Sequence, residues 1–323
     1  MTRWLRYFGC VLLGALLGAG TAFLFHWLRL RGTKVVVPFR QPSAAVLSTT
    51  PQEMRLWPGK APGSENWTQQ EEESNVDGEQ RVFNVVDPTL TAFFPPAGSA
   101  NGTSLIVCPG GSPESLSIGS EGVKVARFLN SLGIAAFVLR HRLAKTDTGF
   151  FSSERNVQMP GSDQLAMEKM TPLITADGQK AVRIVRDHAA QWGLDPHRIG
   201  VLGFSSGGYL ALSLAVRHDA DSMPDFAAPI YAAPSDAVPA ALLNAKPDPI
   251  PMFLACADDD PAADCIRAYN LWHSAGVPVE LHVFVRGGHG FGLKKQDLPS
   301  DAWPELFVHW LQAQGYLSPS AAK

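Results

Sequence analysis

One stretch, residues 198–210 with the sequence RIGVLGFSSGGYL, constrains the fold of this chain more than any other. An apolar run stops at Gly203, reaches Ser205 and passes through Gly207 into a helix-prone segment. This order predicts a buried strand, a sharp turn and a helix. The pattern Gly203-x-Ser205-x-Gly207 is typical of a turn that exposes a strained serine, with small neighbours that let strand and helix pass closely. Ser205 is therefore the candidate nucleophile.

The alternative for this turn is a glycine-rich phosphate cradle. The chain carries neither G-x-G-x-x-G at a strand end nor G-x-x-x-x-G-K-[ST] anywhere, so the sequence does not favour that interpretation.

Composition indicates a globular protein and does not favour nucleic acid as a partner. The chain has 323 residues, of which 46% are hydrophobic and 18% charged, and a formal net charge of −3. This is ample material for a large core, and a near-neutral balance provides no basic surface for nucleic acid. We expect no nucleic-acid partner.

The four cysteines match neither a disulfide framework nor a zinc motif. We therefore expect no metal. Cys256 and Cys265 flank a predicted strand-to-helix loop, where they could be a disulfide in an oxidising compartment or two buried thiols. The sequence leaves both possibilities open.

The N-terminal residues 1–32 predict a membrane anchor or a signal peptide. Residues 8–28 are almost entirely apolar and long enough to cross about 30 Å of hydrocarbon. We favour an uncleaved anchor, with cleavage after Ala22 as the alternative. The catalytic domain is then expected outside the cytoplasm, either tethered to the membrane or released. Residues 33–55 are expected to be a linker, and residues 56–318 the folded domain.

Helices and strands alternate along most of that domain. Repeated β-α units of this length predict an α/β fold: a doubly wound, mostly parallel sheet with helices on both faces. The expected strands are 105–108, 134–139, 199–202, 226–231, 251–256 and 279–285. The expected helices are 123–132, 181–192, 209–216, 262–275 and 303–312.

Three further segments carry less certain patterns. Residues 81–86 and 90–94 have the pattern of an antiparallel pair at a sheet edge. Residues 69–80 are polar and acidic, as expected of a surface stretch. Residues 145–172 lack a clear period, and we weigh a lid over the site equally with a disordered insertion.

A serine nucleophile needs a base, and the base needs an orienting acid. On a doubly wound hydrolase these follow in the order Ser, Asp or Glu, His. His282 lies inside a predicted strand, and His273 and His309 fall on predicted helices. His289 instead follows a strand in the glycine-rich run GGHGFG, where its ring can reach another element. We take His289 as the base.

The candidate acids are Asp258, Asp259 and Asp260, which follow the predicted strand 251–256. Ligands bind at this end of strands in such sheets. Asp260 before Pro261 is also a good helix cap, so position alone does not choose. We favour Asp260.

The oxyanion of an acyl-transfer intermediate needs two backbone donors. One is the N–H after the nucleophile, on Ser206. The other belongs to the loop that follows Cys108, where we favour Gly111 and place Ser112 second.

Several motifs together resemble the α/β-hydrolase branch that contains acetyl-xylan-esterase-like and feruloyl-esterase-like proteins. They are CPGG from Cys108, EGVKVARFLNSLGIAAFVL from Glu121, WGLDPHRIGVLGFS from Trp192 and GGHGFG from Gly287. The resemblance covers roughly residues 56–316. It implies serine ester hydrolysis without a cofactor, on a small-molecule or oligosaccharide ester such as acetylated xylan. In the resembled family the acid is the fourth residue after the position of Cys256, which is Asp260, with Asp259 as the nearest alternative.

The sequence departs from the resembled family beside the acyl group. Ser112 replaces a glycine, Pro113 a common aromatic residue and Ser120 a frequent histidine. A general short-chain carboxylesterase or lipase is therefore an alternative function. A catalytically silent binding protein on the same scaffold is another, and the complete Ser, Asp, His order argues against it.

Overall fold

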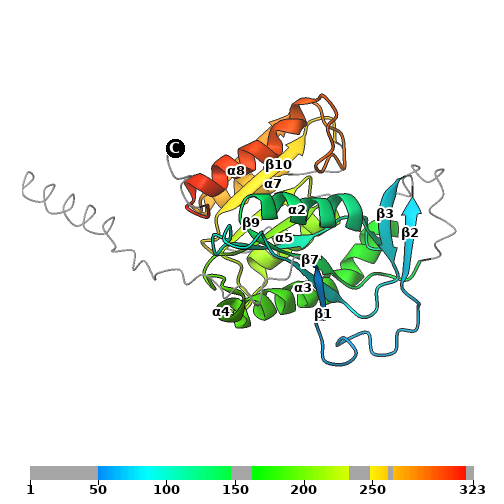
Figure 1. The fold of residues 1–323 in the computed structure, drawn as a ribbon. Coiled ribbons are helices and arrows are strands. Elements are labelled where there is room, and N and C mark those ends of the chain that lie inside the picture. Colours follow the sequence, from blue (N-terminus) through cyan, green and yellow to red (C-terminus); the bar gives the residue numbers. More distant parts are fainter. Residues whose placement is uncertain (1–49, 77, 147–161, 233–247, 261–264, 318–323) are drawn as a thin grey trace, which may run out of the picture. The chain divides into compact units, whose positions relative to one another are not determined.

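The described part of the chain is built around one eight-stranded sheet (Figure 1). The structure is a computed structural model that describes residues 50–76, 78–146, 162–232, 248–260 and 265–317. The strands are β1 Gln52–Arg55, β4 Thr89–Phe93, β5 Ser104–Cys108, β7 Ala135–Arg140, β8 Ile199–Phe204, β9 Phe226–Ile230, β10 Met252–Ala257 and β11 Val279–Phe284.

The sheet is mostly parallel, as the sequence predicts. Its strand order is β1-β4-β7-β5-β8-β9-β10-β11, and the strands from β7 onward in this order run parallel. Only β4 is antiparallel to its neighbours β1 and β7. In the sheet, β7 lies on one side of β5, and β8, which follows β7 in the chain, lies on the other side of β5. This reversal makes β5 and β8 the topological switch point, where ligands bind in open α/β sheets.

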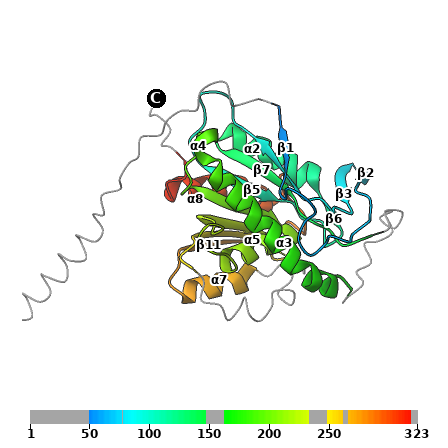
Figure 2. The same ribbon diagram turned by 90° about the horizontal axis from the view of Figure 1, so that it is seen from below.

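Helices cover both faces of the sheet (Figures 1 and 2). One core contains side chains of α3 Ser162–Asp187, α5 Ser206–Val216 and α7 Cys265–Ser274. The other contains side chains of α2 Lys124–Ser131 and α8 Trp303–Ala313. Strand β5 contributes side chains to both cores. Ile106 points into the first core and Leu105 into the second, as the two-residue period of a strand requires. The doubly wound α/β prediction is confirmed.

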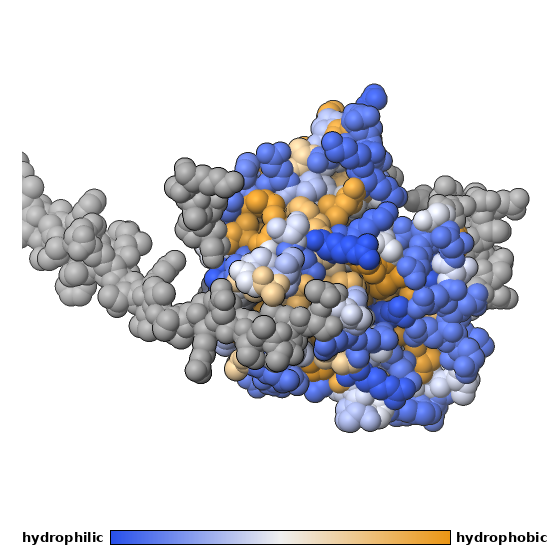
Figure 3. Space-filling view, in the orientation of Figure 1, coloured by the Kyte–Doolittle hydropathy of each residue, from blue (hydrophilic) through white to orange (hydrophobic). Residues whose placement is uncertain are grey.

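Short helices complete the framework. They are the π-helix η1 Ile118–Val123, the helix α4 Ala189–Trp192 and the 3-10 helix η4 Pro299–Ala302. The face shown in Figure 3 is largely hydrophilic, with smaller apolar patches among the polar side chains. In the described residues the exposed large apolar side chains are Ile266, Val283 and Val285.

The predicted pairing of residues 81–86 with 90–94 is wrong. Strand β3 Glu79–Phe83 belongs to a separate three-stranded sheet with β2 Glu72–Val76 and β6 Ser115–Leu116. Asn84 explains the separation: its backbone has φ 57, a left-handed conformation that turns the chain away after β3. The stretch 69–80, expected only at the surface, supplies β2 and the start of β3.

Helix α3 begins far earlier than the predicted helix at 181–192. It includes the end of the segment 145–172, for which we expected a lid or a disordered insertion, and it contains Pro172 in its interior. Met167, Met170 and Ile174 are buried against the core at helical spacing. Residues 147–161 lie outside the described residues, so the lid expectation there stays untested.

A buried ion pair joins α3 to the end of β7. The side chains of Arg142 and Asp177 are fully buried, and Arg142 Nη2 lies 2.9 Å from Asp177 Oδ1. Trp57 Nε1 also donates to Asp177 Oδ1 at 3.0 Å. This contact holds the segment after β1 against the helix. Strand β1, which precedes this segment, begins at Gln52 and pairs with β4.

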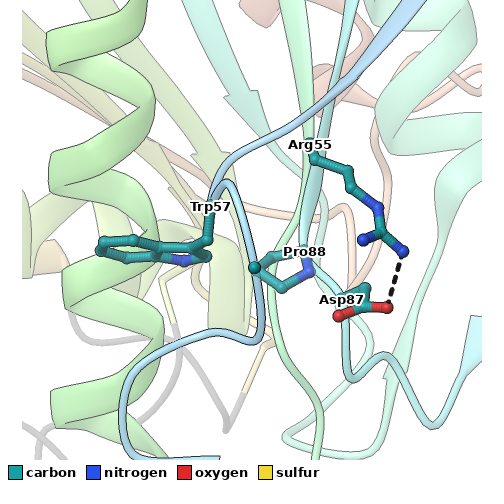
Figure 4. A pocket seen from close by; sticks show the side chains of 5 residues that line it. Arg55, Trp57, Asp87 and Pro88 are labelled. Atoms are coloured by element: carbon teal, nitrogen blue, oxygen red, sulfur yellow. Dashed lines mark hydrogen bonds and ion pairs between the residues drawn. The ribbon is translucent and has the colours of Figure 1, made fainter. Parts of the chain in front are cut away.

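Figure 4 shows this junction from close by. Trp57 reaches toward helix α3, while Arg55 and Asp87 form an exposed ion pair on the other side of Pro88. Together with Gly59 these residues line a small surface hollow. None of the candidate catalytic residues lines it.

The predicted anchor at 1–32 and most of the linker at 33–55 lie outside the described residues. In the part of the chain that the structure describes, none of the helices has the length and apolar character needed to cross a membrane.

Candidate active site

Ser205 stands alone between a strand and a helix, as predicted. Strand β8 ends at Phe204, α5 begins at Ser206, and Ser205 between them has φ 51 and ψ −117. A positive φ is unfavourable for a residue with a side chain, and it persists only where the surroundings enforce it. Here the Ser205 N–H donates to the carbonyl of Ile230 at 3.0 Å, and the Ser205 carbonyl accepts from the N–H of Tyr209. Hydrogen bonds to both the N–H and the carbonyl of Ser205 therefore fix the turn.

The flanking glycines are required by close backbone contacts. A Cβ on Gly203 would lie 2.0 Å from the carbonyl oxygen of Gly207, and a Cβ on Gly207 would lie 2.0 Å from that of Cys108. Both distances are far inside van der Waals contact, so no side chain fits at either position. The predicted close passage of strand and helix is confirmed, and Gly207 also brings α5 against the end of β5.

Ser205, His289 and Asp260 form a continuous hydrogen-bonded line. Ser205 Oγ and His289 Nε2 are 2.8 Å apart, and His289 Nδ1 lies 2.8 Å from Asp260 Oδ2. The Asp260 side chain is fully buried, whereas 37% of the His289 side chain is exposed. An ionised Asp260 accepts from Nδ1–H, which leaves Nε2 as the acceptor that faces the serine hydroxyl.

The side chain of Asp259 binds the backbone of the loop that carries His289. Its Oδ1 accepts the N–H of Gly288 at 2.8 Å and that of Gly287 at 3.0 Å. The two adjacent carboxylates therefore contact different parts of the loop, and Asp260 is the one that contacts the imidazole. The N–H of Asp258, the third candidate, donates to the carbonyl of Phe284 and continues the pairing of β10 with β11.

The loop after β5 lies directly beside Ser205. A Cβ on Gly110 would be 2.8 Å from the Cβ of Ser205, and Cys108 pairs with Gly203 in the sheet. Gly111 has φ 134 and Ser112 has φ 68. Ser112 thus adopts a conformation that a glycine adopts without strain, at the position where the resembled family has one.

The two predicted oxyanion donors lie on the elements that meet at Ser205. Ser206 is the first residue of α5, so the helix itself provides no acceptor for its N–H. Its Oγ also donates weakly to the carbonyl of Ser112 at 3.4 Å, which ties the helix start to the loop. Gly111 follows Gly110 in that loop. The arrangement can place two N–H groups on one side of the serine, as stabilisation of an oxyanion requires.

Sequence reasoning missed a buried pair behind this site, Glu121 and Tyr231. Glu121 Oε2 accepts the N–H of Gly110 at 2.8 Å, and Tyr231 donates its hydroxyl to Glu121 Oε1 at 2.8 Å. Burial raises the pKa of the Glu121 carboxyl, against the hydrogen bonds from Tyr231 and Gly110. The sequence feature that could have indicated Tyr231 is its position, because it directly follows β9 at the same sheet edge as Ser205.

The other histidines have separate partners. His282 Nε2 lies 2.7 Å from Glu280 Oε1 on the same strand, consistent with the structural role expected for it. His273 stacks on Tyr269 within α7. His218 also follows Ser205 in the chain, and its Nε2 lies 3.2 Å from Asp248 Oδ2.

The cysteines and acidic residues offer no metal site in the described residues. No cluster of three or more His, Cys, Asp or Glu side chains there is arranged to hold a metal ion. Cys256 and Cys265 are buried thiols and do not form a disulfide with each other. Burial raises the pKa of the Cys108 thiol to about 12, which keeps it protonated and unreactive at neutral pH.

Comparison with protein families links the region around the Ser205 turn to esterases. The BD-FAE family model matches residues 162–240, which include Ser205. An acetylxylan esterase of Xylanibacter ruminicola is 28% identical over 142 residues, which are 44% of this chain and 24% of that protein. The matched region spans about a quarter of the length of that relative.

Solved structures agree over most of the chain. An acetyl ester-xyloside bifunctional hydrolase from Caldicellulosiruptor lactoaceticus superposes with a TM-score of 0.58 at 25% identity, covering 85% of this chain and 100% of that one. A thermophilic esterase from Thermogutta terrifontis with butyrate bound gives a TM-score of 0.55 at 21% identity, covering 78% and 96% of the two chains. The second likeness shows that the fold is shared.

Proposed function

We propose that this chain, which is similar to α/β-hydrolase esterases of the acetylxylan-esterase-like and feruloyl-esterase-like branch, is a serine carboxylic-ester hydrolase that removes acyl groups from acetylated carbohydrate, such as xylan or its oligosaccharides. One observation carries the proposal: the hydrogen-bonded line from Ser205 through His289 to the buried Asp260. A serine at a glycine-flanked turn has no structural need for such a relay, whereas an acyl-transfer nucleophile does.

The first half-reaction forms an acyl-enzyme. Ser205 Oγ attacks the ester carbonyl carbon while its proton moves to His289 Nε2, 2.8 Å away. The carbonyl π electrons move to oxygen and give a tetrahedral oxyanion. When that intermediate collapses, the bond to the alcohol oxygen breaks and His289 returns the proton to the departing sugar hydroxyl. Ser205 is left as an acyl ester.

Water completes the cycle by the same route. His289 takes a proton from a water molecule as its oxygen attacks the acyl carbon. The second tetrahedral intermediate releases Ser205, which recovers the proton from His289, and the carboxylic acid departs. Asp260 stays ionised throughout and stabilises the imidazolium formed in each step. Burial of its side chain strengthens that interaction, because little water competes for the carboxylate.

The backbone around Ser205 supplies the oxyanion site. The N–H groups of Ser206 and Gly111 are the proposed donors, with Ser112 as the alternative to Gly111. Gly110 contributes by lying close enough to Ser205 to leave no room for a side chain. Such preorganised donors commonly account for about 10²–10³ in kcat each.

The substrate class rests on similarity and on the departures from it. An acetylxylan esterase and an acetyl ester-xyloside hydrolase among the similar proteins support acetylated sugars. A general short-chain carboxylesterase is the second candidate, because similar structures are described as esterases with butyrate and propionate bound. Ser112, Pro113 and Ser120 stand where the resembled family differs, and they are the positions where acyl preference would change.

The proposed location rests on the sequence of the N-terminal segment. The apolar run at residues 8–28 supports a membrane anchor with the catalytic domain outside the cytoplasm, where polymeric or oligomeric sugar esters are encountered, or a secreted enzyme if the segment is cleaved.

A substrate panel tests the proposal. Purified protein is assayed on p-nitrophenyl esters of increasing acyl length and on acetylated xylo-oligosaccharides, with Ser205→Ala as the matched control. We expect hydrolysis of acetyl esters in both kinds of substrate, with the highest kcat/KM on the oligosaccharides. For Ser205→Ala we expect kcat to fall by about 10³-fold or more. Undiminished activity in that variant would exclude the serine mechanism. A preference for longer p-nitrophenyl esters with no release of acetate from sugars would favour the carboxylesterase.

A further inference from the structure

A short chain of buried hydrogen bonds connects the two loops on which the proposed reaction depends. We propose that Glu121 and Tyr231 are positioning residues, which hold the oxyanion loop after β5 and the histidine loop after β11 in one fixed arrangement around Ser205. The inference rests on the proposed function for its effect on catalysis. Its structural part, the coupling of the two loops, is testable without any substrate.

Glu121 provides the central acceptor of this chain. Its side chain is buried in η1, with 6% of the residue exposed. One carboxylate oxygen accepts the N–H of Gly110 at 2.8 Å and the other accepts the hydroxyl of Tyr231 at 2.8 Å. A buried carboxylate is costly unless both oxygens are hydrogen bonded. Most residues of η1 are buried, and Glu121 is the charged one among them, so its contacts indicate a specific task.

Tyr231 extends the connection to the histidine loop. Its hydroxyl oxygen accepts the N–H of Gly292 at 3.1 Å while its proton goes to Glu121. The aromatic ring meets His289 edge-on, with the ring centroids 5.3 Å apart, and packs in the same manner on Phe291 at 4.4 Å. Tyr231 therefore forms a wall beside the imidazole as well as a link to the backbone that follows it.

The backbone of Tyr231 supports a dedicated role. Its φ is 35, a positive value that is rare for a bulky aromatic residue. Strain of this kind persists where surrounding contacts over-determine the conformation, and it is concentrated at functional sites. The strained residue directly follows β9, next to the strand that carries Ser205. Ser205 and Tyr231 thus depart from ordinary backbone geometry side by side at one sheet edge.

Gly110 is the point at which Glu121 acts on the site. It lies between the nucleophile and the carboxylate, because a Cβ there would be 2.8 Å from Ser205 Cβ and 3.0 Å from Glu121 Oε2. Its carbonyl accepts the N–H of Ser117 at 2.7 Å. The peptide unit that follows carries the N–H of Gly111, the proposed oxyanion donor. Releasing the Gly110 N–H therefore removes one of the two hydrogen bonds that hold the backbone next to this donor.

The test uses Tyr231→Phe, which removes one oxygen atom and keeps the ring beside His289. Both Glu121 Oε1 and the Gly292 N–H lose their partner at once. Tyr209→Phe is the matched control: Tyr209 is a fully buried tyrosine of α5, whose hydroxyl is hydrogen bonded to Thr171 of α3 at 3.2 Å. Two measurements are made on each protein. The first is hydrogen exchange of the backbone amides, and the second is steady-state kinetics on p-nitrophenyl acetate, with kcat calculated from the concentration of active sites.

For Tyr231→Phe we expect faster exchange in residues 109–122 and in residues 287–293 together, although these segments are far apart in sequence. We also expect kcat to fall by about tenfold to a hundredfold with KM within about threefold, since the loss concerns a transition-state interaction. Tyr209→Phe should change neither exchange in the two loops nor kcat. Equal loop exchange in Tyr231→Phe and the parent protein would overturn the proposal, as would an equal fall of kcat in the control.

Glu121 variants separate a positioning role from simple filling of space. Glu121→Gln can still accept from Gly110 with its carbonyl and donate to the Tyr231 oxygen with its amide, so it should keep at least about a third of the parent kcat. Glu121→Leu removes both bonds and should match or exceed the loss in Tyr231→Phe. If Glu121→Leu does not fold, Tyr231→Phe decides alone. Equal kcat in the Gln and Leu variants contradicts the role of these hydrogen bonds. A parent protein without esterase activity refutes the proposed function, while the exchange result still decides the coupling.

Discussion

Asp259 Oδ1 accepts the backbone N–H of Gly288 at 2.8 Å, one residue before the histidine whose ring is held by Asp260. Two neighbouring carboxylates at the end of β10 thus fix one loop in two ways. Asp259 sets the path of the backbone, and Asp260 sets the orientation of the imidazole. This division gives separate roles to two of the three aspartates, and Asp260 is the one that faces Nδ1.

The first prediction separates these aspartates by substitution. Asp260→Asn should lower kcat by roughly 10³–10⁴, because the wrong histidine tautomer is then favoured. Asp259→Asn should stay within about tenfold of the parent, since its amide oxygen can still accept both glycine N–H groups. Asp258→Asn is the control and should stay within a few-fold. Steady-state kinetics on one activated ester measures all three. A large loss in Asp259→Asn together with only reduced thermal stability in Asp260→Asn would reverse the assignment.

The second prediction concerns the close contact between α5 and the end of β5, at Gly207. Gly207→Ala places a Cβ 2.0 Å from the carbonyl oxygen of Cys108, so either α5 or β5 must move. We expect a loss of roughly 3 kcal/mol or more in the free energy of unfolding, at the upper end of overpacking effects. Gly59→Ala is the control, because nothing lies within 4 Å of the added Cβ. Urea denaturation of both variants gives the comparison, and equal midpoints would contradict the described contact.

The candidate triad could be predicted from the sequence because chain order and strand ends are local signals. Ser205 stands in a glycine frame, Asp260 follows the buried strand β10, and His289 follows the partly exposed strand β11. Parallel strands bring their carboxyl ends to one edge, so three separate segments had to meet there. The structure brings these three side chains together at hydrogen-bond distances.

The rest depended on contacts that no local pattern encodes. Tyr231 and Glu121 are 110 positions apart, and neither residue type is unusual where it stands. The separate pairing of β3 followed from one left-handed residue, Asn84, within a segment that otherwise alternates like an edge strand. The early start of α3 was obscured by Pro172, which argues against a helix interior, although tertiary packing of Met167 and Met170 outweighs it.

The third prediction concerns the cell fraction in which the protein is recovered. Residues 8–28 lie outside the described residues, and their apolar sequence predicts recovery in the membrane fraction after a high-salt wash. The variant Leu16→Arg, Leu17→Arg is the control, since each arginine at the centre of a spanning helix costs about 2.5–3.5 kcal/mol. It should shift the protein out of that fraction. A soluble parent chain that begins near Phe23 would establish cleavage instead.

The last prediction compares two ion pairs of the same chemistry. Arg142 and Asp177 are both fully buried, and Arg142 also donates to the carbonyls of Pro62 and Leu173. Arg55 and Asp87 form a pair of similar length, 3.0 Å, with 62% and 45% of their side chains exposed. Removing one partner of a buried pair leaves an uncompensated charge, whereas water replaces an exposed partner.

Arg142→Met should therefore lower the free energy of unfolding by about 3–5 kcal/mol, and Arg55→Met by less than about 1 kcal/mol. The double variant Arg142→Met, Asp177→Leu should recover part of the loss, because no buried charge remains. Denaturant unfolding of the four proteins, including the parent, measures each difference. A double variant as unstable as Arg142→Met would show that the hydrogen bonds to Pro62 and Leu173 hold the junction rather than the charge pair.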